Sequence, residues 1–133
     1  MRTFSVLATV FAMSSAFAAA PAIETLPSGV TIQKSRVAKG VSPKATDTVT
    51  VHYRGTLKNG VEFDSSYSRN EPTSFPLNGV IPCWTQAVQG MNVGEKASIM
   101  CPAETAYGSR GIPGTILPNT PLYFVVELLS ISK

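Results

Sequence analysis

Residues 48–66, TVTVHYRGTLKNGVEFDSS, constrain the fold of this chain more strongly than any other stretch. Their first half alternates apolar and polar side chains, and this period of two predicts a strand with one buried face. Asn59-Gly60 is typical of a tight hairpin turn, because both residues tolerate the positive φ that such a turn requires. The hairpin should therefore bring Tyr53 and Phe63 to the same inner face, with the Asp64 carboxylate at its rim.

Residues 1–18 have the organisation of a secretory signal peptide. Arg2 supplies a basic start, residues 4–13 form an apolar centre, and Ala16-Phe17-Ala18 is a small-residue cleavage sequence. We expect export to the periplasm or the medium, with cleavage after Ala18. The apolar centre is shorter than the roughly 20 residues that span a bilayer, so we expect no membrane anchor.

The composition favours one compact domain that does not bind nucleic acid. Hydrophobic residues make up 44% of the chain and charged residues 14%. Removal of the leader would leave ten basic against eight acidic side chains, and no run of Lys or Arg is present. Two cysteines and the single His52 cannot supply the ligands of a structural zinc site without carboxylates, so we expect no metal.

The two cysteines would fold in an oxidising compartment, where a disulfide persists. Cys83 directly precedes Trp84 in an expected helix, and Cys101 points inward from an alternating strand, so both should lie near the Trp84 ring. We predict a Cys83–Cys101 disulfide. The alternative is a pair of buried free thiols.

The rest of the chain predicts a small α+β domain, an antiparallel sheet around one short helix. Residues 84–91 carry apolar side chains at i, i+3, i+4 and i+7, the stripe of a helix that at two turns must pack on a sheet. The expected elements are a flexible lead-in over 19–28, an edge strand over 29–36, the helix over 84–91, a strand over 93–101, a Gly/Pro-rich loop over 107–118 and a central strand over 122–131, with the domain spanning 29–133.

The sequence holds few groups for covalent chemistry. It has no G-x-S-x-G elbow and no Gly-rich phosphate loop that leads into a helix. Several aromatic side chains could instead form an apolar pocket with few polar groups, and these are Tyr53, Phe63, Trp84, Tyr107 and Phe124. The same rings could be ordinary core, since large aromatics usually bury for stability.

Five separate motifs, VHYRGTL, NGVEFDSS, VIPCW, PAETAYGSRGIPG and LYFVVELL, resemble those of the FK506-binding protein domain. That family consists of peptidyl-prolyl cis–trans isomerases, and the resemblance covers residues 29–133 in the family's order. It implies an antiparallel sheet wrapped around a short helix, in agreement with the periodicity. It also implies catalysis without a cofactor, since twisting an X-Pro amide needs no covalent intermediate.

The resemblance implies a role for each matching side chain. Trp84 would form the floor under the substrate proline ring, and the Ile81 N–H and Tyr107 hydroxyl would donate to substrate carbonyls. The implied catalytic residues are Asp64, Tyr107, Ile81 and Phe63. The implied substrate-binding residues are Tyr53, Phe63, Arg69, Val80, Ile81, Trp84, Tyr107, Ile116 and Phe124. Thr73 and Ile112 depart from the best-known members, at positions that bear on substrate preference and inhibitor affinity.

These observations predict an exported, monomeric prolyl isomerase that accelerates X-Pro isomerisation while exported proteins fold. Its partners would be X-Pro segments of unfolded proteins, with macrolides of the FK506 type as inhibitors. Two alternatives remain open from the sequence: a non-catalytic chaperone module that grips proline segments, and a structural secreted β domain.

Overall fold

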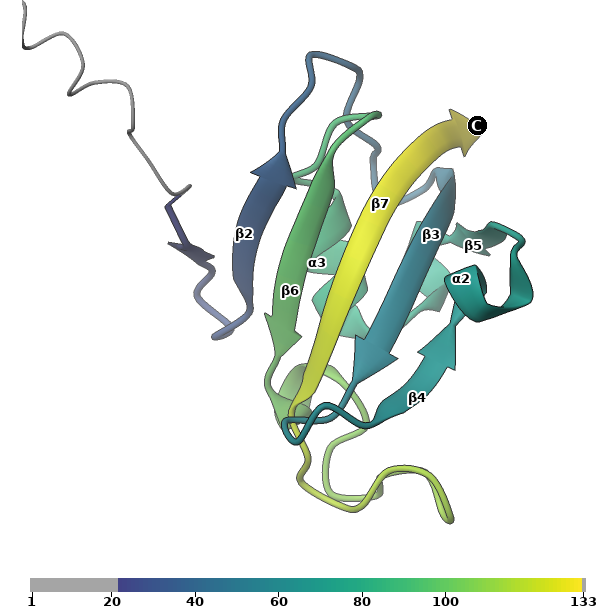
Figure 1. Ribbon diagram of the computed structural model, residues 1–133. Helices are drawn as coiled ribbons and strands as arrows, with labels where there is room; N and C mark the ends of the chain where they lie inside the picture. The colour runs from purple at the N-terminus through teal and green to yellow at the C-terminus, as the bar shows by residue number, and fades with distance from the viewer. Residues whose placement is uncertain (1–21, 133) are drawn as a thin grey trace, which may run out of the picture.

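A computed structural model describes residues 22–132, which form one antiparallel sheet curved around a helix (Figure 1). The sheet order is β1-β2-β6-β7-β3-β4, and β5 also pairs with β3. The strands are β1 Glu24–Thr25, β2 Thr31–Arg36, β3 Thr48–Thr56, β4 Glu62–Ser65, β5 Thr73–Pro76, β6 Lys96–Cys101 and β7 Leu122–Ser132; the helices are α2 Ser66–Arg69 and α3 Pro82–Val88, with 3-10 turns at Leu77–Gly79 and Ala103–Thr105. The expected α+β architecture is confirmed.

The central position predicted for residues 122–131 is confirmed, since β7 lies between β6 and β3. Its side chains alternate: Leu122, Phe124 and Val126 are buried on the side of α3, whereas Tyr123 and Val125 are only partly covered on the other side. The strand therefore has one core face and a second face that, although apolar near its start, is not part of the core.

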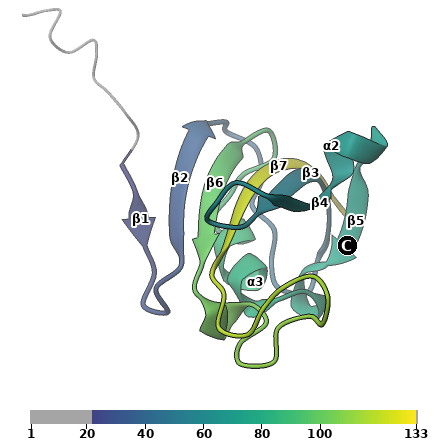
Figure 2. The same cartoon turned by 60° about the horizontal axis from the view of Figure 1, so that its bottom comes forward.

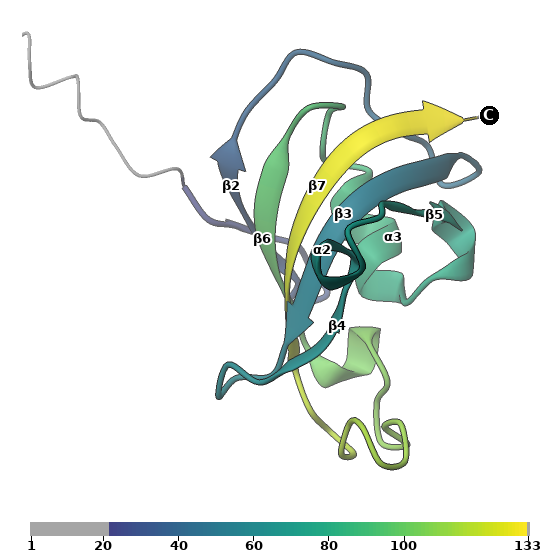
Figure 3. The same cartoon turned by 45° about the vertical axis from the view of Figure 1, so that its right-hand side comes forward.

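Helix α3 lies on the concave face of the sheet and buries the predicted stripe (Figure 3). It runs over Pro82–Val88, whereas the spacing predicted 84–91. It begins earlier because a proline fits the first turn, where its missing N–H is not needed. It ends earlier because the amides of Gly90 and Met91 bond three residues back, which tightens the chain, although Met91 stays fully buried.

The predicted hairpin is present as β3 and β4, but its turn differs from the expectation. Gly60 has φ +90°, while Asn59 is not among the residues with positive φ. The Gly60 amide bonds the Leu57 carbonyl at 2.9 Å, and the Asn59 side chain accepts from the Val61 amide at 3.0 Å. A turn closed by one glycine therefore replaces the expected pair of positive-φ residues.

Residues 66–69 form the short helix α2, which the sequence patterns did not predict. The Ser65 side chain accepts from the Ser68 amide at 3.2 Å and caps its start, and Asn70 ends it with φ +55°. Strands β4 and β5 pair with the two ends of β3 on the same edge, and α2 connects them (Figure 1). The helix is therefore fixed beside the strand that carries Tyr53.

The expectation of a flexible lead-in over 19–28 is wrong for Glu24 and Thr25. These residues pair with Ile32 and Thr31 as β1, so β2 is flanked on both sides and is not the edge strand expected from its pattern (Figure 2). The predicted signal peptide, residues 1–18, lies outside the described residues. Within residues 22–132 no helix has the length and hydropathy needed to cross a membrane.

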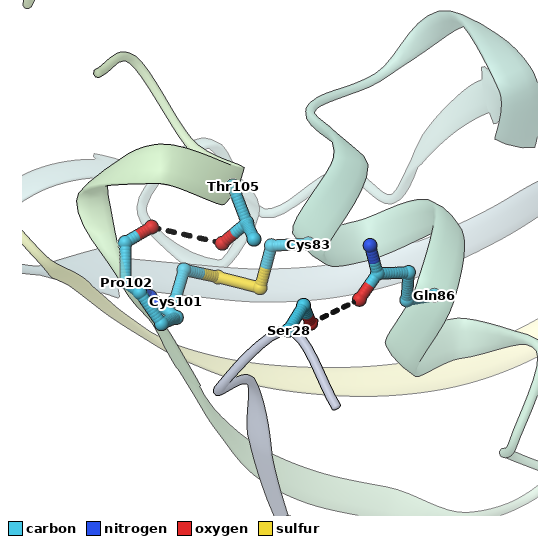
Figure 4. The surroundings of a disulfide bond; sticks show 6 residues. All are labelled: Ser28, Cys83, Gln86, Cys101, Pro102 and Thr105. Atoms are coloured by element: carbon cyan, nitrogen blue, oxygen red, sulfur yellow. Dashed lines mark hydrogen bonds between the residues drawn. A yellow bond between two sulfur atoms is a disulfide. The ribbon is translucent and has the colours of Figure 1, made fainter. Parts of the chain in front are cut away.

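The predicted disulfide between Cys83 and Cys101 is present, with 5.6 Å between the Cα atoms (Figure 4). Both side chains are fully buried. The bond joins the first turn of α3 to the last residue of β6. Next to it, the Ser28 hydroxyl donates to the Gln86 side chain at 2.5 Å, so a second contact holds the outer side of the helix.

Candidate active site

A cavity of about 470 Å³ opens between α3, the β3–β5 edge and the loop that carries Tyr107. Its lining is largely aromatic and aliphatic, as is typical of small-ligand sites. The lining residues are Tyr53, Phe63, Asp64, Phe75, Gly79, Val80, Ile81, Trp84, Tyr107 and Phe124. All four residues implied to be catalytic are among them, as are most of those implied to bind substrate.

Trp84 forms the base of the cavity, and three rings stand almost perpendicular to it. The ring centroids of Tyr53, Phe75 and Phe124 lie 5.3, 5.5 and 5.4 Å from that of Trp84, with interplanar angles of 83–84°. Edge-to-face packing of this kind is the favoured geometry of aromatic pairs. Trp84 is only 4% exposed, and its Nε1 has no hydrogen-bond partner among the described residues.

The wall made by Phe63 and Phe124 depends on a glycine. A Cβ on Gly55 would lie 2.6 Å from the Phe63 ring and 2.8 Å from the Phe124 ring, so no other residue fits there without displacing them. The two rings meet edge to face with centroids 5.7 Å apart. Gly55 thus lets both rings lie directly over β3, and this explains a glycine in a strand interior.

A hydrogen-bonded ion pair borders the cavity on the side of α2. The Tyr53 hydroxyl donates to Asp64 Oδ2 at 2.5 Å, and Arg69 Nη1 donates to Asp64 Oδ1 at 2.9 Å. Arg69 Nη2 also reaches the Tyr53 hydroxyl at 3.3 Å and Thr73 Oγ1 at 3.2 Å. The polar network implied for Asp64, Tyr53 and Arg69 is therefore present.

This network keeps Asp64 ionised. Partial burial raises the pKa of the Asp64 carboxyl, but the hydrogen bonds from Tyr53 and Arg69 outweigh it, and the pKa lies below its usual value. Burial, and then the bond to Asp64, raise the pKa of Tyr53, so its hydroxyl stays a donor. A fixed negative charge therefore stands at the edge of an otherwise apolar cavity.

Tyr107 faces the cavity from the Gly/Pro-rich loop. Its hydroxyl makes no hydrogen bond with any described residue, and the side chain is 37% exposed. Burial, followed by the nearby Asp64 charge, raises the pKa of Tyr107, so the group is a free donor at neutral pH. The loop is fixed by the Gly111 amide on the Tyr107 carbonyl at 3.0 Å and the Gly108 amide on the Ala103 carbonyl at 2.8 Å.

Ile81 lies between the 3-10 turn and α3 and contributes backbone to the cavity. Its carbonyl accepts from the amides of Trp84 at 2.9 Å and Thr85 at 3.3 Å. Because both lone pairs of that oxygen are used, the N–H is the backbone group that Ile81 can offer to a ligand.

Two residues that the resemblance assigns to substrate binding do not line the cavity. Arg69 is not part of the lining but donates to Asp64, which is. Ile116 is only 3% exposed, and it bonds with Ile112 in a bridge that closes the loop on itself. Conversely, Phe75 and Gly79 line the cavity although neither the sequence patterns nor the resemblance gave them a role in the site.

A second cavity, of about 250 Å³, lies on the opposite face of the sheet. Polar and partly exposed side chains from β2, β3, β6 and β7 line most of it, and it contains no carboxylate. Across residues 22–132, no three His, Cys, Asp or Glu side chains are grouped to hold a metal ion. The aromatic cavity is therefore where the chemistry-bearing groups converge.

A family model described as FKBP-type peptidyl-prolyl cis-trans isomerase matches residues 39–129. The chain belongs to this family. The matched range contains every residue that lines the aromatic cavity. It also contains both cysteines and the whole of α2.

Individual FKBP relatives agree with this assignment. The chain is 47% identical over 115 residues to FkpA of Escherichia coli K12, covering 86% of this chain and 42% of FkpA. It is 47% identical over 107 residues to FK506-binding protein 1 of Rhizopus delemar, covering 78% of this chain and 99% of that protein. The chain thus spans less than half the length of FkpA but corresponds to almost all of a small FKBP.

Solved structures show the same fold. A peptidyl-prolyl cis-trans isomerase from Pseudomonas syringae superposes with a TM-score of 0.80 at 36% identity, covering 85% of this chain and 83% of that one. The crystal structure of FkpA from Escherichia coli gives a TM-score of 0.79 at 47% identity, over 83% of this chain and 51% of that one. The FKBP fold implied by the motifs is confirmed.

Proposed function

We propose that this FKBP chain is a peptidyl-prolyl cis-trans isomerase that acts on exposed X-Pro segments of exported proteins. The observation that carries the proposal is the aromatic cavity over Trp84, bordered by the Tyr53–Asp64–Arg69 network and facing the free hydroxyl of Tyr107. Family membership supports the same activity.

The proposed mechanism is non-covalent. An X-Pro amide rotates slowly because resonance sets a barrier of about 18–20 kcal/mol. Moving its carbonyl from water into an apolar cavity disfavours the charge-separated resonance form that keeps the amide planar. A site complementary to the twisted amide therefore lowers the barrier without a nucleophile.

Each lining group has a defined part in this proposal. The proline ring rests on Trp84 in the cavity, with the Phe63 and Phe124 rings as one wall. The Ile81 N–H and the Tyr107 hydroxyl donate to peptide carbonyls on either side of the ring. The Asp64 carboxylate, held by Tyr53 and Arg69 at the border of the cavity, disfavours the negatively charged carbonyl oxygen of the planar, charge-separated amide and so favours the twisted one.

Two observations support action on exported proteins. The N-terminal residues have the pattern of a signal peptide, and a buried disulfide suits an oxidising compartment. One relative, 42% identical over 113 residues, is named outer membrane protein MIP, from Legionella longbeachae. We propose a monomer for this chain, with FK506-type macrolides as competitors for the cavity.

The test is exchange NMR on a short X-Pro peptide with a catalytic amount of protein. Wild type should accelerate cis–trans exchange, while Phe63→Ala and Asp64→Ala should each reduce kcat/KM by about tenfold or more. Leu117→Ala is the matched control, since Leu117 lies in the same loop as Tyr107 but is 77% exposed and does not line the cavity. Peptide binding without faster exchange would exclude an isomerase and leave a chaperone module.

A further inference from the structure

The short helix that carries Arg69 cannot by itself hold this side chain in place. Arg69 is the last residue of α2, which has four residues and would be unstable alone. Its guanidinium nevertheless bonds Asp64, the Tyr53 hydroxyl and Thr73 together. Contacts between α2 and the sheet must therefore fix the place from which Arg69 reaches into the network.

Tyr67 makes the first contact between α2 and the sheet, on the outer face of the sheet, away from α3. Its ring stacks on the ring of His52, with centroids 4.7 Å apart and an interplanar angle of 14°. Its hydroxyl donates to Glu127 Oε1 at 3.1 Å. His52 and Glu127 are directly opposed on β3 and β7, so one tyrosine covers a pair of neighbours on two strands.

The charges around this tyrosine form an ordered row across the sheet. Arg36 Nη2 lies 2.6 Å from Glu127 Oε2, and Lys96 is directly opposed to both Glu127 and Arg36. Burial, and then the bond to Glu127, raise the pKa of Tyr67 to about 12, so it remains a donor at neutral pH. The carboxylate is thus held on one side by Arg36 and on the other by Tyr67.

Ser66 makes the second contact of α2, with the backbone of β3. Its fully buried hydroxyl oxygen accepts from the Tyr53 amide at 2.7 Å and lies 2.8 Å from His52 Nδ1. His52 therefore contacts two successive residues of α2, one through its edge and one through its ring face. Ser66 thus holds the backbone of Tyr53, the residue whose side-chain hydroxyl donates to Asp64.

We propose that Tyr67 is a positioning residue for the active site: by clamping α2 to His52 and Glu127 on the outer face of the sheet, it holds Arg69 on Asp64 at the cavity. Tyr67 does not touch the cavity itself. The kinetic consequence rests on the proposed isomerase function, whereas the geometric one does not.

The direct test is the pKa of Asp64, measured by NMR titration of its carboxyl carbon in full-length protein. In Tyr67→Ala the pKa should rise, because α2 loses its clamp and Arg69 no longer donates steadily to Asp64. The other groups that act on Asp64 are Tyr53, Tyr107, Glu62 and the backbone amide of Ser65, and none of them is replaced in this variant. Tyr67→Phe keeps the stack on His52 and loses only the bond to Glu127. In this variant the pKa of Asp64 should lie between those of wild type and Tyr67→Ala.

Tyr123→Ala is the matched control. Tyr123 is a partly buried tyrosine on the same face of β7 as Glu127, but it pairs with Thr56 and Met100, away from α2. It should leave the pKa of Asp64 at the wild-type value. An Asp64 pKa that is equal in wild type and Tyr67→Ala, with the variant folded by circular dichroism, overturns the proposal.

Kinetics provide an independent measurement. Tyr67→Ala should lower kcat on the order of tenfold with little change in KM, since the rings over Trp84 are untouched. A loss confined to KM, or a loss of kcat that Tyr67→Phe does not partly restore, contradicts positioning through the clamp. If wild type shows no isomerase activity, the proposed function fails, while the Asp64 titration still decides the role of Tyr67.

Discussion

Reduction of the Cys83–Cys101 disulfide should destabilise this domain by an amount set by the length of the loop that the bond closes. The two cysteines are 18 positions apart. The chain-entropy relation gives about 3 kcal/mol at 25 °C for a loop of this length. With an unfolding entropy of about 2 cal/mol/K per residue, a domain of about 110 residues should lose about 13 °C in Tm.

The assay compares oxidised and fully reduced wild type by denaturant unfolding and calorimetry. Both sulfur atoms stay in the core after reduction, so the comparison isolates the cross-link from the loss of packing that alanine variants would add. The slope m should also increase on reduction, because the unfolded chain exposes more surface without the loop. A stability difference below about 1 kcal/mol with an unchanged slope would refute the entropic argument.

Three further predictions concern single groups. Trp84→Leu should keep the fold, by circular dichroism, but weaken binding of a proline peptide about tenfold in calorimetric titration, and unchanged affinity would exclude Trp84 as the floor. Because the pKa of Asp64 lies below its usual value, kcat/KM should stay level as pH falls through the ordinary aspartate range and drop only when that carboxylate protonates. The buried Glu95 carboxylate accepts from Lys34 at 2.8 Å and from two backbone amides, so Glu95→Gln should cost about 2 kcal/mol in denaturant unfolding while the exposed control Glu71→Gln costs almost nothing.

The Glu95 carboxylate also determines whether stability rises or falls as the pH is lowered. Burial raises the pKa of Glu95, but the bonds from Lys34 and from the amides of Ala38 and Asn92 lower it further, to below its model-peptide value of 4.5. Its contribution to stability is therefore complete above the unfolded pKa and is lost as pH falls through the folded one. Wild type should lose more stability than Glu95→Gln in that acid range.

The sequence predicted the long elements well because their side-chain periods record burial directly. Strand β6 buries Ala97, Ile99 and Cys101, as its alternation indicated, and β3 buries Val49, Val51 and Tyr53. The short elements were missed because tertiary contacts stabilise them. Helix α2 has one turn and no apolar stripe. Strand β1 has only two residues, too few to show an alternating pattern, and it is defined by its pairing with β2.

The site shows the same division. Motif resemblance found the rings around Trp84, but Phe75 reaches that ring only because β5 pairs with the start of β3, which sets Phe75 opposite Val49. Nothing in the letters TSFP specifies that partner strand. Ile116 shows the reverse case: the family resemblance assigns it to substrate binding, and in the structure its side chain is almost completely buried behind the bridge with Ile112. Pairing between distant segments decides which apolar residues of these short stretches line a cavity, and local sequence does not encode it.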